Sequence, residues 1–313
     1  MASATYSAEE SKELYGYASA LTSYRLQNGQ IDSHGLLRIL VWDKISSKGV
    51  DLVPPRSIGQ RIAVMQCNDI YRLKDIFEHA SSDNMEWNVT QPISDDLFDL
   101  NNGEKDFFKR PVLVRENAVY GNFFNHIFFQ RYGYHIEGYG TISQETTLQT
   151  SEFTHHDFFI NANNIEEVSY LTTALGLKAE DQPKIDSAAQ KGPKAVFQMQ
   201  EGEGHWYQGF VSPNNICGKL KMFVPTSPTE DHSKNQKLGA EGITMHSFWT
   251  DKLDFVFDLV KQHNLSPCEI MANEFGEQCF TFVGPGGCSW QIIQKKQSQH
   301  KPKTELGFTF TKN

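Results

Sequence analysis

The chain has 313 residues, a length for which a division into two domains is a reasonable expectation. Its 29 Lys and Arg are outnumbered by 38 Asp and Glu, and the net charge of −9 argues against a nucleic-acid-binding protein, whose binding face is normally basic. With 12 % aromatic residues, 22 of them Phe, the chain can bury a large core, so general disorder is excluded.

Composition also indicates where the protein works. No apolar run approaches the roughly 18 residues of a membrane-spanning helix, and the first residues lack the basic and apolar regions of a signal peptide. The five cysteines are scattered and are expected to be reduced thiols. We therefore expect a soluble, cytoplasmic protein with a small-molecule ligand and with neither nucleic-acid nor membrane partners; a homodimer is left open.

Four segments have the apolar periodicity of a helix, and β-branched or aromatic runs lie between them. The helices are expected at residues 7–20, which begin with the capping box Ser7-Ala-Glu-Glu10, and at 69–80, 163–176 and 251–263. The runs predict strands at residues 36–42, 61–67, 111–115, 122–130, 153–160, 195–200, 206–211, 242–249, 268–272, 278–283 and 288–293.

The order of a strand, a helix and about three strands repeats along the chain. The third and fourth repeats are the clearest, the second runs from residue 61 to about 130, and the first is weak. This order predicts an α+β fold of four βαβββ modules. A polar stretch at residues 136–152 predicts a domain boundary near 145, which divides the chain into two pairs of modules. Residues 1–145 are expected to be mainly structural, and residues 146–313 to carry the site and a short basic tail.

The repeat resembles the vicinal oxygen chelate superfamily, which includes glyoxalase I, extradiol dioxygenases and bleomycin-resistance proteins. The resemblance is carried by the turn and strand Gly284-Pro-Gly-Gly-Cys-Ser-Trp-Gln-Ile-Ile and by the strand and helix that begin at Phe248-Trp-Thr-Asp. It covers residues 153–294 best. It implies that each pair of modules forms an open, cup-shaped mixed sheet with flanking helices, and that the first and last strands bind a divalent metal on the concave face.

The resemblance also implies which residues occupy the ligand positions of the strands. The first-strand position of the third module falls on His156, or on His155 if the strand has a bulge. In the fourth module it falls on Met245, so that His246 points away unless a bulge intervenes. The last-strand positions hold amides where the superfamily has Glu; they are Gln291 in the fourth module, Gln208 in the third and Asn125 in the second.

Two alternatives for this site stay open. His156, His246 and Gln291 could bind Fe, Mn, Ni or Zn, which would act as a Lewis acid. The amides could instead form a metal-free pocket as hydrogen-bond donors and acceptors.

The resemblance implies an enzyme that acts on a small apolar or aromatic oxygenated metabolite, and we favour lyase or isomerase chemistry through an enolate-like intermediate. His156 would be a ligand or general base, Gln291 would bind the metal or a substrate oxygen, and Tyr207 would donate a proton. The expected substrate-binding residues are Gln208, Trp206, Phe248 and Trp290. An extradiol-type dioxygenase and a non-catalytic, ligand-sequestering protein are the alternatives.

Overall fold

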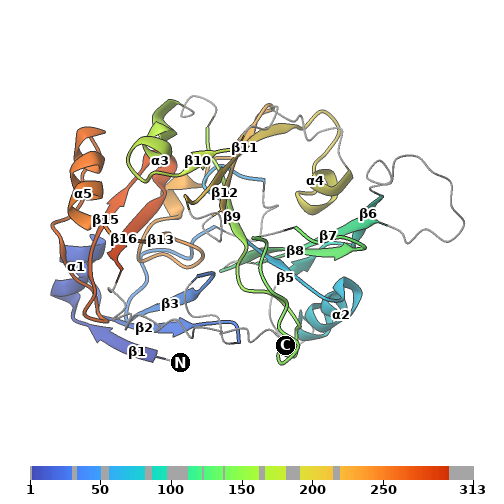
Figure 1. Ribbon diagram of the computed structural model, residues 1–313, viewed down its shortest axis with the longest axis horizontal. Coiled ribbons are helices and arrows are strands. Elements are labelled where there is room, and N and C mark those ends of the chain that lie inside the picture. The colour runs from blue at the N-terminus through green and yellow to red at the C-terminus, as the bar shows by residue number, and fades with distance from the viewer. Residues whose placement is uncertain are drawn as a thin grey trace, which may run out of the picture.

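The computed structural model describes residues 2–29, 34–50, 56–81, 87–96, 112–121, 123–136, 138–161, 166–180, 191–213 and 219–295. In these ranges the protein has an α+β fold of three sheets with few helices (Figure 1). Every helix among them is too short or too polar to cross a lipid bilayer.

The second and third modules form one central sheet. The second consists of β4 (Arg61–Gln66), α2 (Ile70–Ser81), β5 (Trp87–Val89), β6 (Ile93–Asp96), β7 (Leu113–Gly121) and β8 (Asn125–Tyr132). The third consists of β9 (His155–Phe159), a 3-10 helix (Glu166–Ser169), α3 (Tyr170–Thr173), β10 (Lys178–Ala179), α4 (Lys191–Val196), β11 (His205–Val211) and β12 (Lys219–Pro225). The strand order is β10-β11-β12-β9-β4-β8-β7-β5, and β6 pairs with β7.

The first strands of these two modules meet at the centre of the sheet. β4 and β9 are antiparallel neighbours, and each is parallel to the last strand of its own module. Their hydrogen bonds join the two sides of the boundary predicted near residue 145. The second module therefore pairs with the third and not with the first, because the backbone N–H and C=O groups at the edges of β4 and β9 form hydrogen bonds with each other. The polar stretch before β9 is a connection within one sheet.

The fourth module packs against the first unit of the chain. The fourth consists of β13 (Met245–Thr250), α5 (Leu253–Gln262), β14 (Met271–Ala272), β15 (Gln278–Val283), a 3-10 turn (Pro285–Gly287) and β16 (Ser289–Gln294), with β13 parallel to β16. A further 3-10 helix (Ser233–Asn235) precedes it. The first unit consists of β1 (Ala2–Tyr6), α1 (Ala8–Tyr15), β2 (Leu21–Leu26) and β3 (Leu37–Trp42) in one antiparallel sheet. It thus departs from the βαβββ pattern, and it shares a core with β15 and β16.

Helices α1, α2 and α5 begin within two residues of their predicted first residues. Ser7 Oγ accepts a hydrogen bond from the Glu10 amide at 3.3 Å, and the Glu10 carboxylate accepts one from the Ser7 amide, which completes the capping box of α1. Asp69 caps α2 by accepting from the amides of Tyr71 and Arg72 at 3.1 Å. The third predicted helix is only the four-residue α3 after a 3-10 turn.

Several elements differ from the sequence prediction, because no predicted strand corresponds to β1, β2, β5, β6 or β10. Two further differences lie in the third module. The strand expected at residues 195–200 is replaced by the end of α4, whose Pro193 is tolerated in the first helical turn. Strand β12 was not predicted, because its lysines and terminal proline weaken the strand pattern.

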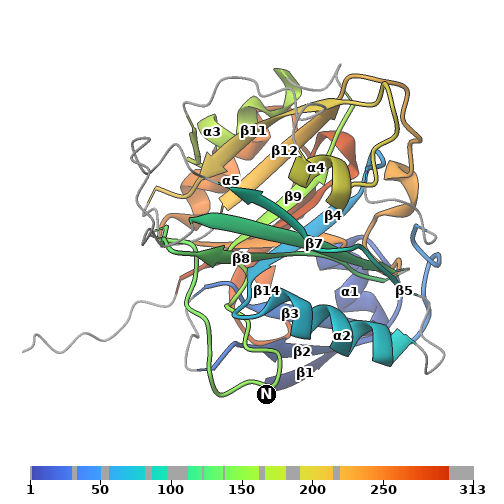
Figure 2. The same ribbon diagram turned by 90° about the vertical axis from the view of Figure 1, so that its right-hand side faces the viewer.

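The two faces of the central sheet carry different helices. We call the face that α4 contacts the inner face; α4 lies against β6 and β7, and Phe197 just after it contacts Phe159 and Phe223. Figure 2 shows α4 in front of this sheet. On the opposite, outer face, α2 packs on the β4–β8 half, and the fourth module with α3 packs on the β9–β12 half.

A buried arginine of β4 joins the central sheet to the fourth module. Arg61 is 1 % exposed, and its Nη1 donates to the carbonyl oxygens of Gln236 at 2.8 Å and Ile243 at 2.9 Å. Its Nη2 donates to the Gly287 carbonyl at 2.8 Å, and its Nε to Cys288 Sγ at 3.3 Å. One guanidinium thus fixes the segment before β13 and the turn before β16.

We expect Arg61→Met to lower the free energy of unfolding by about 2–4 kcal/mol, because three buried carbonyl groups lose their donor. Urea denaturation of the variant and the wild type measures this. Arg72→Met, at an exposed position of α2, is the control and should change stability by less than about 0.5 kcal/mol. Equal effects of the two substitutions would contradict the role of Arg61.

Candidate functional site

Charged and phenolic side chains gather on the inner face of the central sheet. Because side chains alternate along a strand, His155 and Asp157 of β9 both point to this face, and Lys219 and Lys221 of β12 lie directly beside them in register. The other contributors are Gln66, Glu116, Arg131, Tyr139 and Tyr207.

The centre of the group is buried. His155 is 1 % and Asp157 3 % exposed, and His155 Nε2 lies 3.4 Å from Asp157 Oδ1. Burial and the nearby Lys221 ammonium lower the pKa of His155 well below its usual value, so the imidazole is neutral. The other ring nitrogen, Nδ1, lies 3.1 Å from Thr154 Oγ1.

Two carboxyl groups of the inner face titrate near neutrality. Burial raises the pKa of Asp157 to about 7, against an opposing effect of the Lys221 ammonium. Burial likewise raises the pKa of Glu116 to about 7, and Lys221 again opposes the shift. Burial alone would lower the pKa of Lys221, but Tyr139, Asp157, Tyr207 and Glu116 outweigh it, so the pKa is raised and the amine is charged.

The cations of the inner face lie on aromatic rings. Lys219 Nζ is 4.4 Å and the Arg131 guanidinium 4.3 Å from the ring centroid of Tyr139, and Lys221 Nζ is 5.4 Å from that of Tyr207. Arg131 Nη1 also donates to Gln66 Oε1 at 2.9 Å. The positions of three positive charges are thereby fixed.

Two glycines leave room for carboxylates at this face. A Cβ atom on Gly192 of α4 would lie 2.6 Å from Glu116 Oε1, and one on Gly209 of β11 would overlap the Glu180 carboxylate. Gly209 is the register partner of Lys221. Gly192 thus lets α4 approach the Glu116 carboxyl group closely.

The residues predicted for substrate binding and for proton donation lie in two places. Trp206, Tyr207 and Gln208 are on β11, and Phe248 and Trp290 are in the fourth module. Tyr207, the predicted proton donor, lies on the inner face and packs with Phe223. Trp206 packs against the outer core, and Gln208 Nε2 donates to the Glu180 and Gly209 carbonyl groups at 2.9 Å. Phe248 and Trp290 stack in the core between the central sheet and the fourth module, away from the inner face.

The structure brings His156 and His246 together, but between the sheets. Their ring centroids are 5.2 Å apart, and His246 has Trp290 as register partner in a strand pair without a bulge. Burial lowers the pKa of His156 to about 4, and burial with the neighbouring His156 lowers that of His246 well below its usual value. His126 of β8, whose pKa burial also lowers to about 4, extends this neutral core cluster.

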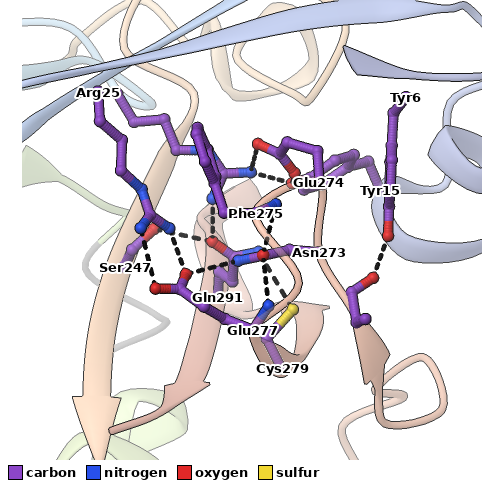
Figure 3. A network of polar contacts seen from close by, with 12 residues as sticks. Tyr6, Tyr15, Arg25, Ser247, Asn273, Glu274, Phe275, Glu277, Cys279 and Gln291 are labelled. Carbon is purple, nitrogen blue, oxygen red and sulfur yellow. Dashed lines mark hydrogen bonds and ion pairs between the residues drawn. The ribbon is translucent and has the colours of Figure 1, made fainter. Parts of the chain in front are cut away.

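Gln291 lies on the face of the fourth module's sheet that the first unit covers, and we call this face the inner face of the fourth module (Figure 3). Its Oε1 accepts hydrogen bonds from Arg38 of β3 and from Ser247 Oγ, the latter at 3.3 Å. Its Nε2 donates to Cys279 Sγ at 3.4 Å. Both ends of the Gln291 amide are therefore used inside the protein.

Two ion pairs close this second face. Arg38 Nη2 lies 2.6 Å from Glu274 Oε1, and Arg25 Nη1 donates to Glu277 Oε1 at 2.9 Å. Tyr15 of α1 donates to Glu274 Oε2 at 2.7 Å (Figure 3). The Glu274 side chain is fully buried beneath residues of the first unit. The network joins the first unit to the hairpin of β14 and β15, and we assign it a structural role.

The donor set of neither inner face suits a divalent metal. The last strand of the third module is β12 and not β11, so the ligand position passes from Gln208 to Lys221, whose ammonium repels a cation. In the second module, Asn125 Nδ2 donates to Gln60 Oε1 at 2.7 Å. Within the described ranges, no three His, Cys, Asp or Glu side chains form a group that could hold a metal ion.

The sequence matches no known family model and no curated protein. Among solved structures it is similar to a candidate dioxygenase of Bacillus subtilis (9 % identity, 88 % of this chain and 73 % of that chain, TM-score 0.49). It is also similar to a variant of glyoxalase I from Zea mays (12 %, 88 % and 80 %, TM-score 0.48) and to a glyoxalase family protein from Bacillus cereus (12 %, 45 % and 91 %, TM-score 0.38).

The strand order of the second, third and fourth modules defines the class of fold. In each, a first strand, a helical segment and three or four further strands form a sheet whose first strand is parallel to the last. The three modules thus have the βαβββ order, with the first strand parallel to the last, that the resemblance to the vicinal oxygen chelate superfamily implies.

We expect Asp157→Asn to raise the free energy of unfolding at pH 8, with a gain that fades toward pH 4. The folded-state pKa of about 7 lies above the ordinary 3.8, so the wild type loses stability as pH rises from about 4 to about 7. The gain should grow by roughly 1.4 kcal/mol per pH unit in that window. Denaturation at pH 5 and pH 8, with the exposed Asp258→Asn as control, measures it; a gain independent of pH would contradict the buried carboxyl.

Proposed function

We propose that the inner face of the central sheet catalyses proton transfer on a small oxygenated metabolite without a metal ion. The observation that carries the proposal is the Lys221 ammonium, which interacts with two carboxyl groups, Asp157 and Glu116, whose pKa values lie near 7. In this proposal the reaction is an isomerisation or elimination through an enolate-like intermediate.

The carboxyl groups suit the proton-transfer step. A general acid or base works best when its pKa is near the working pH, and Asp157 and Glu116 meet that condition through burial. Asp157 in its ionised form would remove a proton from the carbon next to a carbonyl group. The protonated carboxyl would then return the proton to the same or a neighbouring carbon, so that no oxidant or reductant is needed.

Lys221 suits the stabilisation of the enolate oxygen. A fixed ammonium in a mostly buried setting lowers the energy of a developing oxyanion without reorganisation of solvent. Tyr207 lies beside Lys221, and burial raises the pKa of its phenol, so the group stays protonated and can donate a hydrogen bond. Tyr207 thus keeps the proton-donor role expected from the sequence.

The alternatives depend on other features. A dioxygenase requires a metal, and the donor set of the inner face does not suit one. A ligand-sequestering protein would use the same inner face, so only a measurement of turnover separates it from an enzyme.

We expect the protein to accelerate exchange of protons next to a carbonyl group for deuterium in D2O. Proton NMR of acetoacetate and of small hydroxyketones, with and without protein, measures the rate. Asp157→Asn should lower the rate at least a hundredfold, because removal of a general base typically costs that much. The exposed Asp258→Asn should match the wild type.

Absence of exchange with every probe, together with binding of one of them, would contradict catalysis and favour the sequestering protein. Exchange that persists in Asp157→Asn and in Glu116→Gln would contradict the roles of these carboxyl groups.

We also expect exchange to survive removal of metals. Elemental analysis after dialysis against EDTA should give substoichiometric Fe, Mn, Ni and Zn, with an unchanged rate. A stoichiometric metal that is lost in His156→Ala, and whose removal stops exchange, would contradict the metal-free proposal.

A further inference from the structure

The geometry points to a short-chain oxo or hydroxy carboxylate as the substrate class, with its carboxylate bound by Arg131 and Lys219 and its carbonyl oxygen at Lys221. This inference deepens the proposed function and rests on it, because it concerns the same inner face.

The three cations form no close ion pair among the described residues, and Lys221 interacts with the Asp157 and Glu116 carboxyl groups only at longer range. Ion pairs within 4.0 Å between described residues do not include Arg131, Lys219 or Lys221. Arg131 Nε is in addition buried without a hydrogen-bond partner. Lys219 is only 8 % exposed. Buried or half-buried cations without a partner are costly in folding, and an anionic ligand would remove that cost.

The carboxyl groups of the inner face only partly balance this charge. Glu116, Asp157 and Glu180 face the three cations. Burial raises the pKa of Glu116 to about 7, so this carboxyl group is only partly ionised at pH 7 and the inner face carries a small positive charge. Its charge is therefore opposite to the net charge of −9 of the whole chain.

The arrangement of the cations matches a carboxylate. Lys219 Nζ and the Arg131 guanidinium lie 4.4 Å and 4.3 Å from the ring centroid of Tyr139, so both charges are next to the same side chain. An arginine with free N–H groups binds a carboxylate through two hydrogen bonds, which a neutral carbonyl cannot accept as strongly.

The spacing along β12 sets the size of the ligand. Lys219 and Lys221 are two residues apart on the same face, which is about 7 Å along a strand. A carboxylate near Lys219 and a carbonyl oxygen near Lys221 are then separated by only a few bonds. The proton that Asp157 removes would lie between these two groups, where both acidify it.

Acetoacetate and its neutral amide, acetoacetamide, test this inference as a matched pair. Titration followed by calorimetry should show acetoacetate binding at least tenfold more tightly than acetoacetamide. Arg131→Gln and Lys219→Met should each weaken acetoacetate binding at least tenfold and leave acetoacetamide unchanged. Lys219→Arg should restore binding, which separates loss of charge from misfolding. Lys12→Gln, at an exposed position of α1, is the control and should bind like the wild type.

The outcomes separate this inference from the proposed function. Equal affinity for the two probes, with deuterium exchange into both, would overturn the anionic substrate class and leave proton transfer intact. Tight binding of acetoacetate without exchange would support the substrate class and contradict proton transfer. Failure of both probes to bind a folded wild-type protein would overturn the inference.

Discussion

The buried guanidinium of Arg61 is the contact on which the arrangement of the modules depends. It projects from the outer face of β4, at the centre of the nine-stranded sheet, and binds backbone carbonyl groups of the segment before β13 and of the turn before β16. A charged group can be buried at such a place only if acceptors surround it. Arg61 therefore fixes its part of the outer face as an interior layer, and we place the ligand on the opposite, inner face.

The two inner faces of the protein differ in whether their buried charges form ion pairs. On the fourth module, Arg25 and Arg38 are paired with Glu277 and Glu274, and the Gln291 amide is satisfied at both ends. On the central sheet, the cations have no carboxylate within ion-pair distance among the described residues, and two acids are driven toward their neutral forms. A fully hydrogen-bonded network joins the fourth module to the first unit. A buried charge without an ion pair raises the energy of the protein, and a ligand of opposite charge would lower it.

The sequence predicts the modules better than their pairing. Helix caps and apolar periodicity locate α1, α2 and α5, because these signals are local. The union of β4 with β9 depends on strand edges far apart in the sequence, which no local pattern reports. For the site, counting along β9 selects His156, one residue from His155 and Asp157, and in a strand that difference reverses the face. Lys221 escaped prediction because an alternation of lysines is typical of an exposed segment, whereas here carboxylates and phenols stabilise it.

Because Lys221 is part of β12, the inner face acquires its positive charge when the chain folds. A bound ion is acquired after folding and can be exchanged, stripped or replaced by a competing ion, whereas an ammonium belongs to the polypeptide. Once β12 pairs with β9, the positive charge is present at full occupancy, regardless of metal supply or chelators. Under the proposed metal-free function, maturation would require folding alone, and the inner face would hold the same charge in a metal-starved cell as in a replete one.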